Sequence, residues 1–135
     1  MKKPTVLVVD DSKPILVLLK AVLGRNYDVF AANDGFGAMD WLMRGNKPDI
    51  VISDLNMPNI DGVELISYLS NSSYYCNIPV LVLSGADEND ILKKQIGFHV
   101  AGFIAKPFDP SVLLEKVANA IFRKEHSKNG SFQIS

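Results

Sequence analysis

The chain has 135 residues, of which 47% are hydrophobic and 21% charged, and its formal net charge is −1. This length and composition predict one globular domain, and the single cysteine, Cys76, excludes an intrachain disulfide. The charge gives no bulk attraction to nucleic acid or acidic lipid, and no apolar stretch approaches the roughly 20 residues that span a bilayer. We therefore expect a cytoplasmic protein that neither binds nucleic acid directly nor inserts into membranes.

Short apolar runs rich in β-branched residues predict five strands. In chain order they cover residues 6–9, 29–32, 50–52, 80–83 and 103–105. The second and fifth are the weaker patterns. The other three are nearly continuous apolar runs, which suit strands covered on both faces, as in a parallel sheet.

Amphipathic patterns predict a helix after each of the first two strands. Pro14 suits the first turn of a helix, and an apolar stripe follows it from Ile15 to Leu23. A weaker helical pattern covers residues 36–44.

Three further helices are predicted in the second half of the chain. Asp61 and Glu64 resemble a capping box at the start of the third helix. A weaker pattern covers residues 88–96, and Asp109 marks the start of a last helix whose apolar stripe extends to Ile121.

Strands and helices thus alternate five times along the chain. This alternation predicts an α/β fold with a doubly wound parallel sheet and right-handed crossovers. We expect a single domain over residues 1–124, followed by a flexible polar tail over residues 125–135, where periodicity is lost.

Polar residues follow four of the predicted strands at the point where each strand ends. Asp10 and Asp11 follow the first strand, Asp54 the third, Ser84 the fourth and Lys106 the fifth. Because ligands of open α/β sheets bind at the carboxyl ends of the strands, we expect these side chains at one edge. Each residue alone has an ordinary explanation as a helix cap, a turn residue or a solvated charge. Their joint occurrence in strand order favours a site.

This set of groups suits a divalent cation and a phosphoryl group together. Carboxylates gathered in one place repel one another, and a hard cation such as Mg²⁺, which prefers oxygen ligands, relieves that repulsion. Lys106 supplies a positive charge for phosphate oxygens, and Ser84 supplies a hydrogen-bond donor. Asp54 is then the candidate nucleophile, which would form an aspartyl phosphate.

Four segments of the chain resemble the signature segments of two-component response-regulator receiver domains of the chemotaxis type. They are Val8-Val9-Asp10-Asp11-Ser12, residues 53–62, Val82-Leu83-Ser84-Gly85 and Ala105-Lys106-Pro107-Phe108. The resemblance extends over roughly residues 4–124. It implies a flavodoxin-like fold, with a five-stranded parallel sheet in the order 2-1-3-4-5 and five surrounding helices.

The resemblance also implies a metal site for Mg²⁺ or Mn²⁺ beside a phosphoacceptor. Asp54 is the expected phosphoacceptor and also a metal ligand. Asp11 is expected to bind the ion directly, Asp10 mainly through water, and Asn56 through its backbone carbonyl.

A switch mechanism is implied as well. Ser84 is the expected switch hydroxyl, and Phe103 is the aromatic residue expected to turn inward when Ser84 moves toward the phosphate. Lys106 is expected to bind the phosphoryl group, and the bond between Lys106 and Pro107 is expected to be cis.

The implied function is a phosphorelay switch rather than a turnover enzyme, one that assists its own phosphorylation and dephosphorylation. The expected upstream partner is a histidine kinase or a histidine phosphotransfer domain, the downstream partner is an unidentified protein, and a homodimer is a further possibility. Asn56 and Ala86 stand at positions that tune the phosphate lifetime, and together they favour a lifetime of minutes.

Three other interpretations stay open at this point. An Mg²⁺-dependent aspartyl-phosphate phosphohydrolase would need a second acid two residues after the nucleophile, where this chain has Asn56. A flavodoxin-like cofactor binder would need a phosphate-binding loop where this chain has Asp10 and Asp11. The domain could also be part of a longer regulator, because no output segment is recognisable after residue 124.

The first predicted helix carries more apolar surface than one core-facing stripe needs. Leu16 and Val17 lie beside that stripe. They are either buried against neighbouring elements or part of a docking face for a phosphodonor near Asp11.

Overall fold

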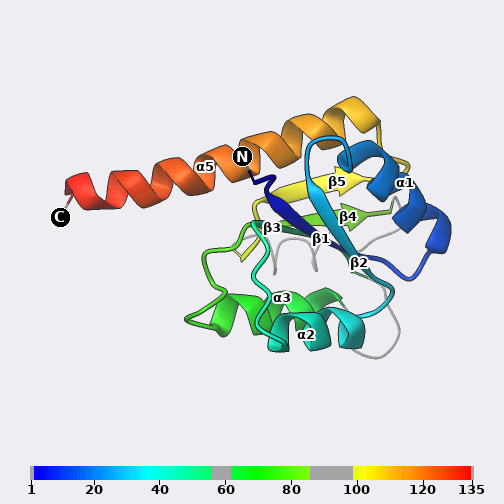
Figure 1. Cartoon of the computed structure of the whole chain (residues 1–135), viewed down its shortest axis with the longest axis horizontal. Helices are drawn as coiled ribbons and strands as arrows, with labels where there is room; N and C mark the ends of the chain where they lie inside the picture. Colours follow the sequence, from blue (N-terminus) through cyan, green and yellow to red (C-terminus); the bar gives the residue numbers. More distant parts are fainter. Residues whose placement is uncertain (1, 56–61, 86–98, 135) are drawn as a thin grey trace.

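The computed structural model describes residues 2–55, 62–85 and 99–134, and the side chains of these residues as far as 125 (Figure 1). Its centre is a five-stranded sheet in the order β2-β1-β3-β4-β5, with every neighbouring pair parallel. The strands are β1 (Thr5–Val9), β2 (Asp28–Ala32), β3 (Ile50–Asp54), β4 (Val80–Ser84) and β5 (Gly102–Ala105). The predicted fold class and strand order are therefore confirmed.

Helices cover both faces of the sheet (Figure 1). The described helices are α1 (Lys13–Leu23), α2 (Gly35–Met43), α3 (Gly62–Asn71) and α5 (Pro110–Ile134). α1 and α5 lie on one face, and α2 and α3 lie on the other. The helix predicted over residues 88–96 and the predicted capping residue Asp61 lie outside the described residues.

The helices α1 and α2 begin directly after strands because short polar residues cap them. The Ser12 hydroxyl accepts a hydrogen bond from the Ile15 N–H at 3.4 Å, and Pro14 occupies the first turn of α1, as predicted. The Asp34 carboxylate accepts one from the Gly37 N–H at 2.7 Å. These caps turn the chain sharply at the carboxyl edge of the sheet, so that the residues between strand and helix stay at that edge.

The core consists of two apolar clusters, one on each face of the sheet. Alternate residues of β3 point to opposite faces: Val51 packs with Leu65 of α3, whereas Ile52 packs with Leu19 of α1 and Leu113 of α5. All five residues of β3 are buried, including its polar end. The near-continuous apolar runs of the sequence therefore reflect a sheet that is covered on both sides.

Helix α5 continues through residues 125–134, the stretch for which the sequence predicts a flexible polar tail (Figure 1). The apolar stripe ends at Ile121, but Lys124 and Glu125 are good helix formers and no proline follows Pro110, so the helix continues past the stripe although Asn129 and Gly130 are weak helix formers. Flexibility of this segment and the domain boundary at residue 124 stay predictions. In the part of the chain that the structure describes, no helix is both long and apolar enough to cross a membrane.

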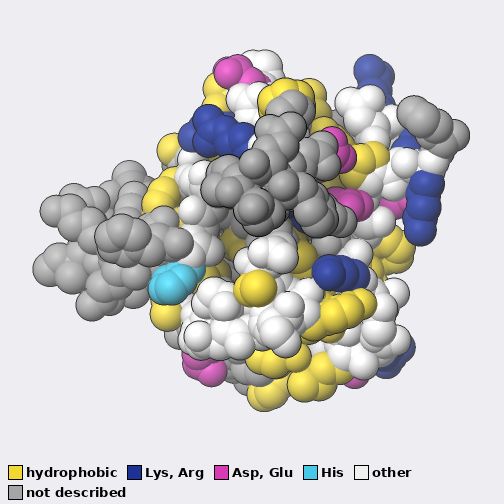
Figure 2. All heavy atoms as spheres, turned by 90° about the vertical axis from the view of Figure 1, so that its left-hand side faces the viewer, with side chains coloured by type: hydrophobic (Ala, Val, Ile, Leu, Met, Phe, Trp, Pro, Cys, Tyr) yellow, Lys and Arg dark blue, Asp and Glu magenta, His cyan; other side chains and the backbone are white. Residues whose placement is uncertain are grey.

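The face of the molecule shown in Figure 2 carries side chains of both charges between apolar ones. Among the described residues in that view, no single-sign charged patch dominates. This agrees with the formal net charge of −1.

A buried hydrogen bond between α2 and the segment after α3 gives a test of the fold. The Tyr75 hydroxyl donates to the Leu42 carbonyl at 2.8 Å, and that carbonyl also accepts from the Gly45 N–H at 3.0 Å. Tyr75→Phe should therefore lower the free energy of unfolding by about 1 kcal/mol, the net value of one hydrogen bond, because the carbonyl keeps a partner. Urea denaturation measures this change.

The matched control is Tyr74→Phe, because the Tyr74 side chain is 52% exposed. It should change the free energy of unfolding by less than about 0.5 kcal/mol. Equal effects of the two substitutions would contradict the contact between Tyr75 and Leu42.

Candidate functional site

The carboxyl edge of the sheet brings together the polar residues that the sequence singles out. Asp10 and Asp11 follow β1, Asp54 is the last residue of β3, Ser84 is the last residue of β4, and Lys106 follows β5. The strands are parallel neighbours in register, so all four ends lie at one edge. The fold therefore brings these residues together, as expected from the sequence.

The three aspartates form a compact acidic cluster. One carboxylate oxygen from each of Asp10, Asp11 and Asp54 lies within 4.8 Å of the others. Asp10 and Asp54 are buried, with exposed fractions of 0% and 6%, whereas Asp11 is exposed. The Ser12 N–H donates to Asp10 Oδ1 at 2.9 Å and thereby fixes the orientation of the most deeply buried carboxylate.

One ammonium group faces this cluster. Lys106 Nζ lies 2.9 Å from Asp10 Oδ2 and 3.2 Å from Asp54 Oδ2, so it pairs with both buried carboxylates. Among the described residues, three carboxylates against one ammonium leave the site with an excess of negative charge. Burial of charge without full compensation is unfavourable, so the site can gain free energy from a further cation.

These carboxylates also control the protonation of the lysine. Burial lowers the pKa of Lys106, but the close contact with the Asp10 carboxylate and its charge, followed by the charge of Asp54, outweigh burial and leave the pKa above its usual 10.5. The folded state therefore holds this proton more tightly than the unfolded chain does. The resulting stabilisation is complete below the ordinary pKa of lysine and is lost as the pH rises through the raised value.

The donor set fits a hard divalent cation. All three side chains offer carboxylate oxygens, and Mg²⁺ typically uses one or two carboxylates together with water. Asp10 Oδ2 supplies a second argument. Among the described residues, it is the buried side-chain oxygen without a well-directed hydrogen bond, although Lys106 Nζ lies close to it. Asn56, the predicted backbone ligand, lies outside the described residues.

The predicted switch residues lie on β4, the strand beside that of Asp54, and on β5, the next strand out. Ser84 is buried at 5% exposure, and its carbonyl accepts a hydrogen bond from the Lys106 N–H at 2.8 Å. Phe103 on β5 is half-buried and packs against the apolar cluster on the α2 and α3 face. The bond between Lys106 and Pro107 is cis, as predicted, and Ala86 lies outside the described residues.

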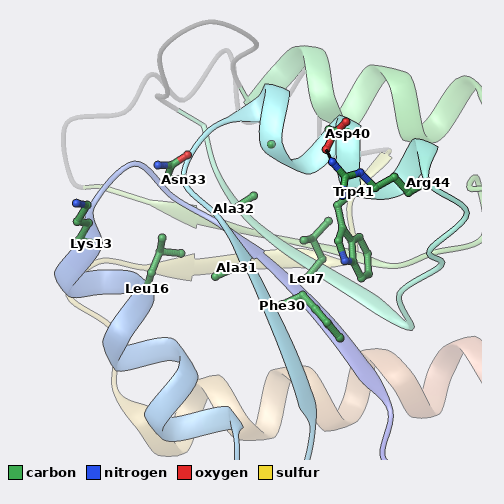
Figure 3. A pocket seen from close by; sticks show the side chains of 11 residues that line it. Leu7, Lys13, Leu16, Phe30, Ala31, Ala32, Asn33, Asp40, Trp41 and Arg44 are labelled. Carbon is green, nitrogen blue, oxygen red and sulfur yellow. Dashed lines mark ion pairs between the residues drawn. The ribbon is translucent and has the colours of Figure 1, made fainter.

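A groove of about 500 Å³ runs beside the acidic edge, between α1, β2 and α2 (Figure 3). Its apolar lining includes Leu16 and the rings of Phe30 and Trp41, whose centroids are 5.1 Å apart, and Lys13 and Asn33 lie at its end near the acidic edge. The groove does not contain the acidic cluster. The sequence pattern does not indicate this groove, because the exposure of Phe30 follows from the position of β2 at one edge of the sheet.

For the extra apolar residues of α1, two explanations were open: burial against neighbouring elements, and a docking face for a phosphodonor. Leu16 is half-buried and packs against the α1 and α5 face of the core, while it also lines the groove. Val17 is 68% exposed. Burial therefore explains part of the apolar excess of α1, and Val17 presents the rest to solvent.

Comparison with known proteins identifies the family. Residues 6–118 match the model of the response regulator receiver domain. The chain is 33% identical over 119 residues to a chemotaxis protein CheY homolog of Campylobacter jejuni, covering 85% of this chain and 90% of that protein. It is also 31% identical over 122 residues to the sensor histidine kinase TmoS of Ectopseudomonas mendocina, covering 90% of this chain but only 12% of that kinase.

A solved structure agrees with this assignment. The chemotaxis response regulator CheY4 of Vibrio cholerae superposes with a TM-score of 0.79 at 30% sequence identity, covering 88% of this chain and 99% of that one. Family, fold and acidic edge agree, and the chain belongs to the response regulator receiver domains of two-component signalling.

Proposed function

We propose that this receiver domain is a phosphorylation-dependent switch in which Asp54 accepts a phosphoryl group from a histidine kinase or a histidine phosphotransfer domain. The observation that carries the proposal is the position of the Asp54 carboxylate. It lies in the acidic cluster and 3.2 Å from Lys106 Nζ, at the carboxyl edge of a sheet. The candidate nucleophile, the ammonium that would bind phosphate and the candidate metal ligands thus lie together at this edge.

The proposed reaction transfers a phosphoryl group between two side chains. An oxygen of Asp54 attacks phosphorus, the bond between phosphorus and the donor histidine nitrogen breaks, and an acyl phosphate forms on Asp54. Bound Mg²⁺, held by Asp10, Asp11 and Asp54, would neutralise charge on the phosphoryl oxygens. Lys106 binds one phosphoryl oxygen as a point charge, and the Ser84 hydroxyl donates to another.

The proposed signal passes from Ser84 to Phe103. Ser84 is paired with Ala105 in the sheet register, and Phe103 lies two residues before Ala105 on β5. A movement of Ser84 toward the phosphoryl group would change the packing space beside Phe103, and with it the face formed by the helix predicted over residues 88–96, β5 and α5. In this proposal the domain acts in the cytoplasm as a switch and not as an enzyme with an external substrate. Its downstream partner and homodimer formation stay predictions.

Phosphorylation itself gives the first test of the proposal. Incubation with acetyl phosphate and Mg²⁺ should add about 80 Da, the mass of one phosphoryl group, because Asp54 is a carboxylate nucleophile. Asp54→Asn should abolish the gain, as read by intact mass. Asp28→Asn is the control, since Asp28 is exposed at the opposite end of β2, and it should keep the gain. Labelling of Asp54→Asn to the wild-type extent would refute the assignment.

Metal binding gives the second test. Mg²⁺ at about 100 times its dissociation constant should stabilise the wild type by about 2.7 kcal/mol and raise its melting temperature. Asp11→Asn should reduce this shift because it removes an exposed member of the acidic cluster. Without metal the same variant should be at least as stable as the wild type, because like charges repel less.

Asp28→Asn again serves as the control in this experiment and should keep the full shift with Mg²⁺. An undiminished shift in Asp11→Asn would exclude Asp11 as a ligand. Calorimetric melting with and without Mg²⁺ distinguishes these outcomes.

The exposed apolar surface of α1 gives the third test. Val17 lies in the helix that follows Asp11 and is 68% exposed, so it is a cleaner probe of docking than the half-buried Leu16. Val17→Glu should slow transfer from a phosphorylated histidine kinase by about tenfold, the effect of losing one apolar interface contact. Uptake from acetyl phosphate should not change.

Met43→Glu is the matched control for Val17→Glu. Met43 is equally exposed, at 67%, but lies at the far end of α2 from the acidic edge. It should leave both rates unchanged. Equal slowing from both donors in Val17→Glu would exclude a docking role for this surface.

A further inference from the structure

The backbone on both sides of the peptide group between Asp54 and Leu55 is held by contacts that the proposed chemistry does not use. The Ser53 hydroxyl donates a hydrogen bond to the Asp54 carbonyl at 2.9 Å, and both groups are buried. The Gly62 N–H, at the start of α3, donates to the Leu55 carbonyl at 3.0 Å. We call the Ser53 hydroxyl and the Gly62 backbone together the backbone clamp.

Gly62 lies so close to this peptide group that no side chain fits. A Cβ atom there would lie 2.1 Å from the Asp54 carbonyl oxygen and 2.7 Å from Leu55 Cα. Both are backbone atoms, so no rotamer change can relieve the contact. Opening the 2.1 Å contact to 3.0 Å, the shortest distance that real Cβ atoms show, would require a shift of 0.9 Å.

Such a shift would reach the proposed nucleophile directly. The Asp54 carboxylate is joined to its backbone through only two rotatable bonds, so its position follows the backbone at this residue. It must stay 3.2 Å from Lys106 Nζ and within 4.8 Å of the other carboxylates. Misplacement of a reacting group by about 1 Å can cost a hundredfold in rate.

We propose that Ser53 and Gly62 are positioning residues for phosphoryl transfer, and that the backbone clamp holds the Asp54 carboxylate at its place between Lys106 and the metal ligands. This inference rests on the proposed function, because it assigns the residues that place its nucleophile. The contacts that carry it are those at the Asp54 carbonyl and at Gly62.

The first experiment compares Gly62→Ala with Gly37→Ala. Both glycines lie in the first turn of a helix that follows a strand, but a Cβ at Gly37 would meet its nearest neighbours at 3.4 Å. The phosphorylation rate with acetyl phosphate is measured by intact mass at saturating Mg²⁺, under conditions where each variant is folded by urea denaturation. Gly62→Ala should be at least about tenfold slower than the wild type, and Gly37→Ala should lie within about twofold of it.

The second experiment isolates the hydroxyl of Ser53. Ser53→Thr and Ser53→Val add nearly the same volume at this buried position, but only threonine keeps the donor to the Asp54 carbonyl. The threonine variant should be phosphorylated about fivefold faster than the valine variant, the effect of one hydrogen bond that holds the transition-state geometry. A role in packing alone would slow both variants equally.

The outcomes separate this inference from the proposed function. If the wild type is labelled and folded Gly62→Ala is labelled within about twofold of Gly37→Ala, the positioning role is overturned while the switch stands. If Gly62→Ala does not fold, equal rates for the two Ser53 variants overturn it.

If the wild type itself is not labelled, the proposed function fails, and Mg²⁺ affinity decides the position of Asp54. Gly62→Ala should then bind Mg²⁺ at least about tenfold more weakly than Gly37→Ala, as measured by the Mg²⁺ dependence of the melting temperature. Equal affinities would overturn the inference in that case.

Discussion

The ion pairs of Lys106 with two buried aspartates are the contacts on which the site depends. Asp10 and Asp54 would be costly to bury alone, and a single ammonium at 2.9 and 3.2 Å compensates them only partly because Asp11 adds a third carboxylate. The sheet imposes this unfavourable arrangement. β3 is buried along its whole length, and the neighbouring parallel strands end at the same edge. The stability that the core provides on both faces therefore maintains an acidic edge that is itself destabilising, a trade that is common at functional sites.

Much of the fold follows from the apolar pattern, and the differences have identifiable causes. The central strands β1, β3 and β4 are nearly continuous apolar runs because both faces are covered, and they are the strands that the sequence predicts most clearly. β2 and β5 give weaker patterns because they lie at the edges of the sheet, where Phe30 of β2 stays 45% exposed. β3 extends two residues beyond its apolar run because its polar end, Ser53 and Asp54, is also buried. The length of α5 could not be predicted from the sequence, because the apolar stripe ends at Ile121 and the stretch beyond it contains the weak helix formers Asn129 and Gly130.

In the candidate site, too, the sequence predicts the residue types, whereas their burial and exact positions depend on tertiary packing. The residue types at the strand ends, together with the family resemblance, were sufficient to name the three aspartates, Ser84 and Lys106. The strand-end pattern does not distinguish Asp10, which is fully buried, from its neighbour Asp11, which is exposed, because they are adjacent in the chain and differ only in how the turn after β1 is packed. Nor does it reveal that Gly62 approaches the Asp54 carbonyl, since that contact joins the end of a strand to the start of a helix several residues later. Exact geometry, and with it the rate of any chemistry, is set by these tertiary contacts.

The connection between the acidic edge and the rest of β5 is the feature that makes a switch physically reasonable. Lys106 takes part in both: its ammonium pairs with Asp10 and Asp54, and its backbone N–H donates to the Ser84 carbonyl at 2.8 Å. A phosphoryl group on Asp54 would place close to two negative charges next to this ammonium, where the carboxylate carries one, and would compete with Asp10 for it. A ligand shifts a conformational equilibrium only through a difference in its contacts with the two states, and the contacts of Lys106 and Ser84 are the ones that such a charge would change. Because both residues adjoin β5, the rearrangement proposed around them would reach Phe103 without a long chain of intermediate contacts. In the proposed function, the excess of negative charge among the described side chains at this edge would favour a bound cation, and the cation and Lys106 together would then compensate the charge of the phosphoryl group.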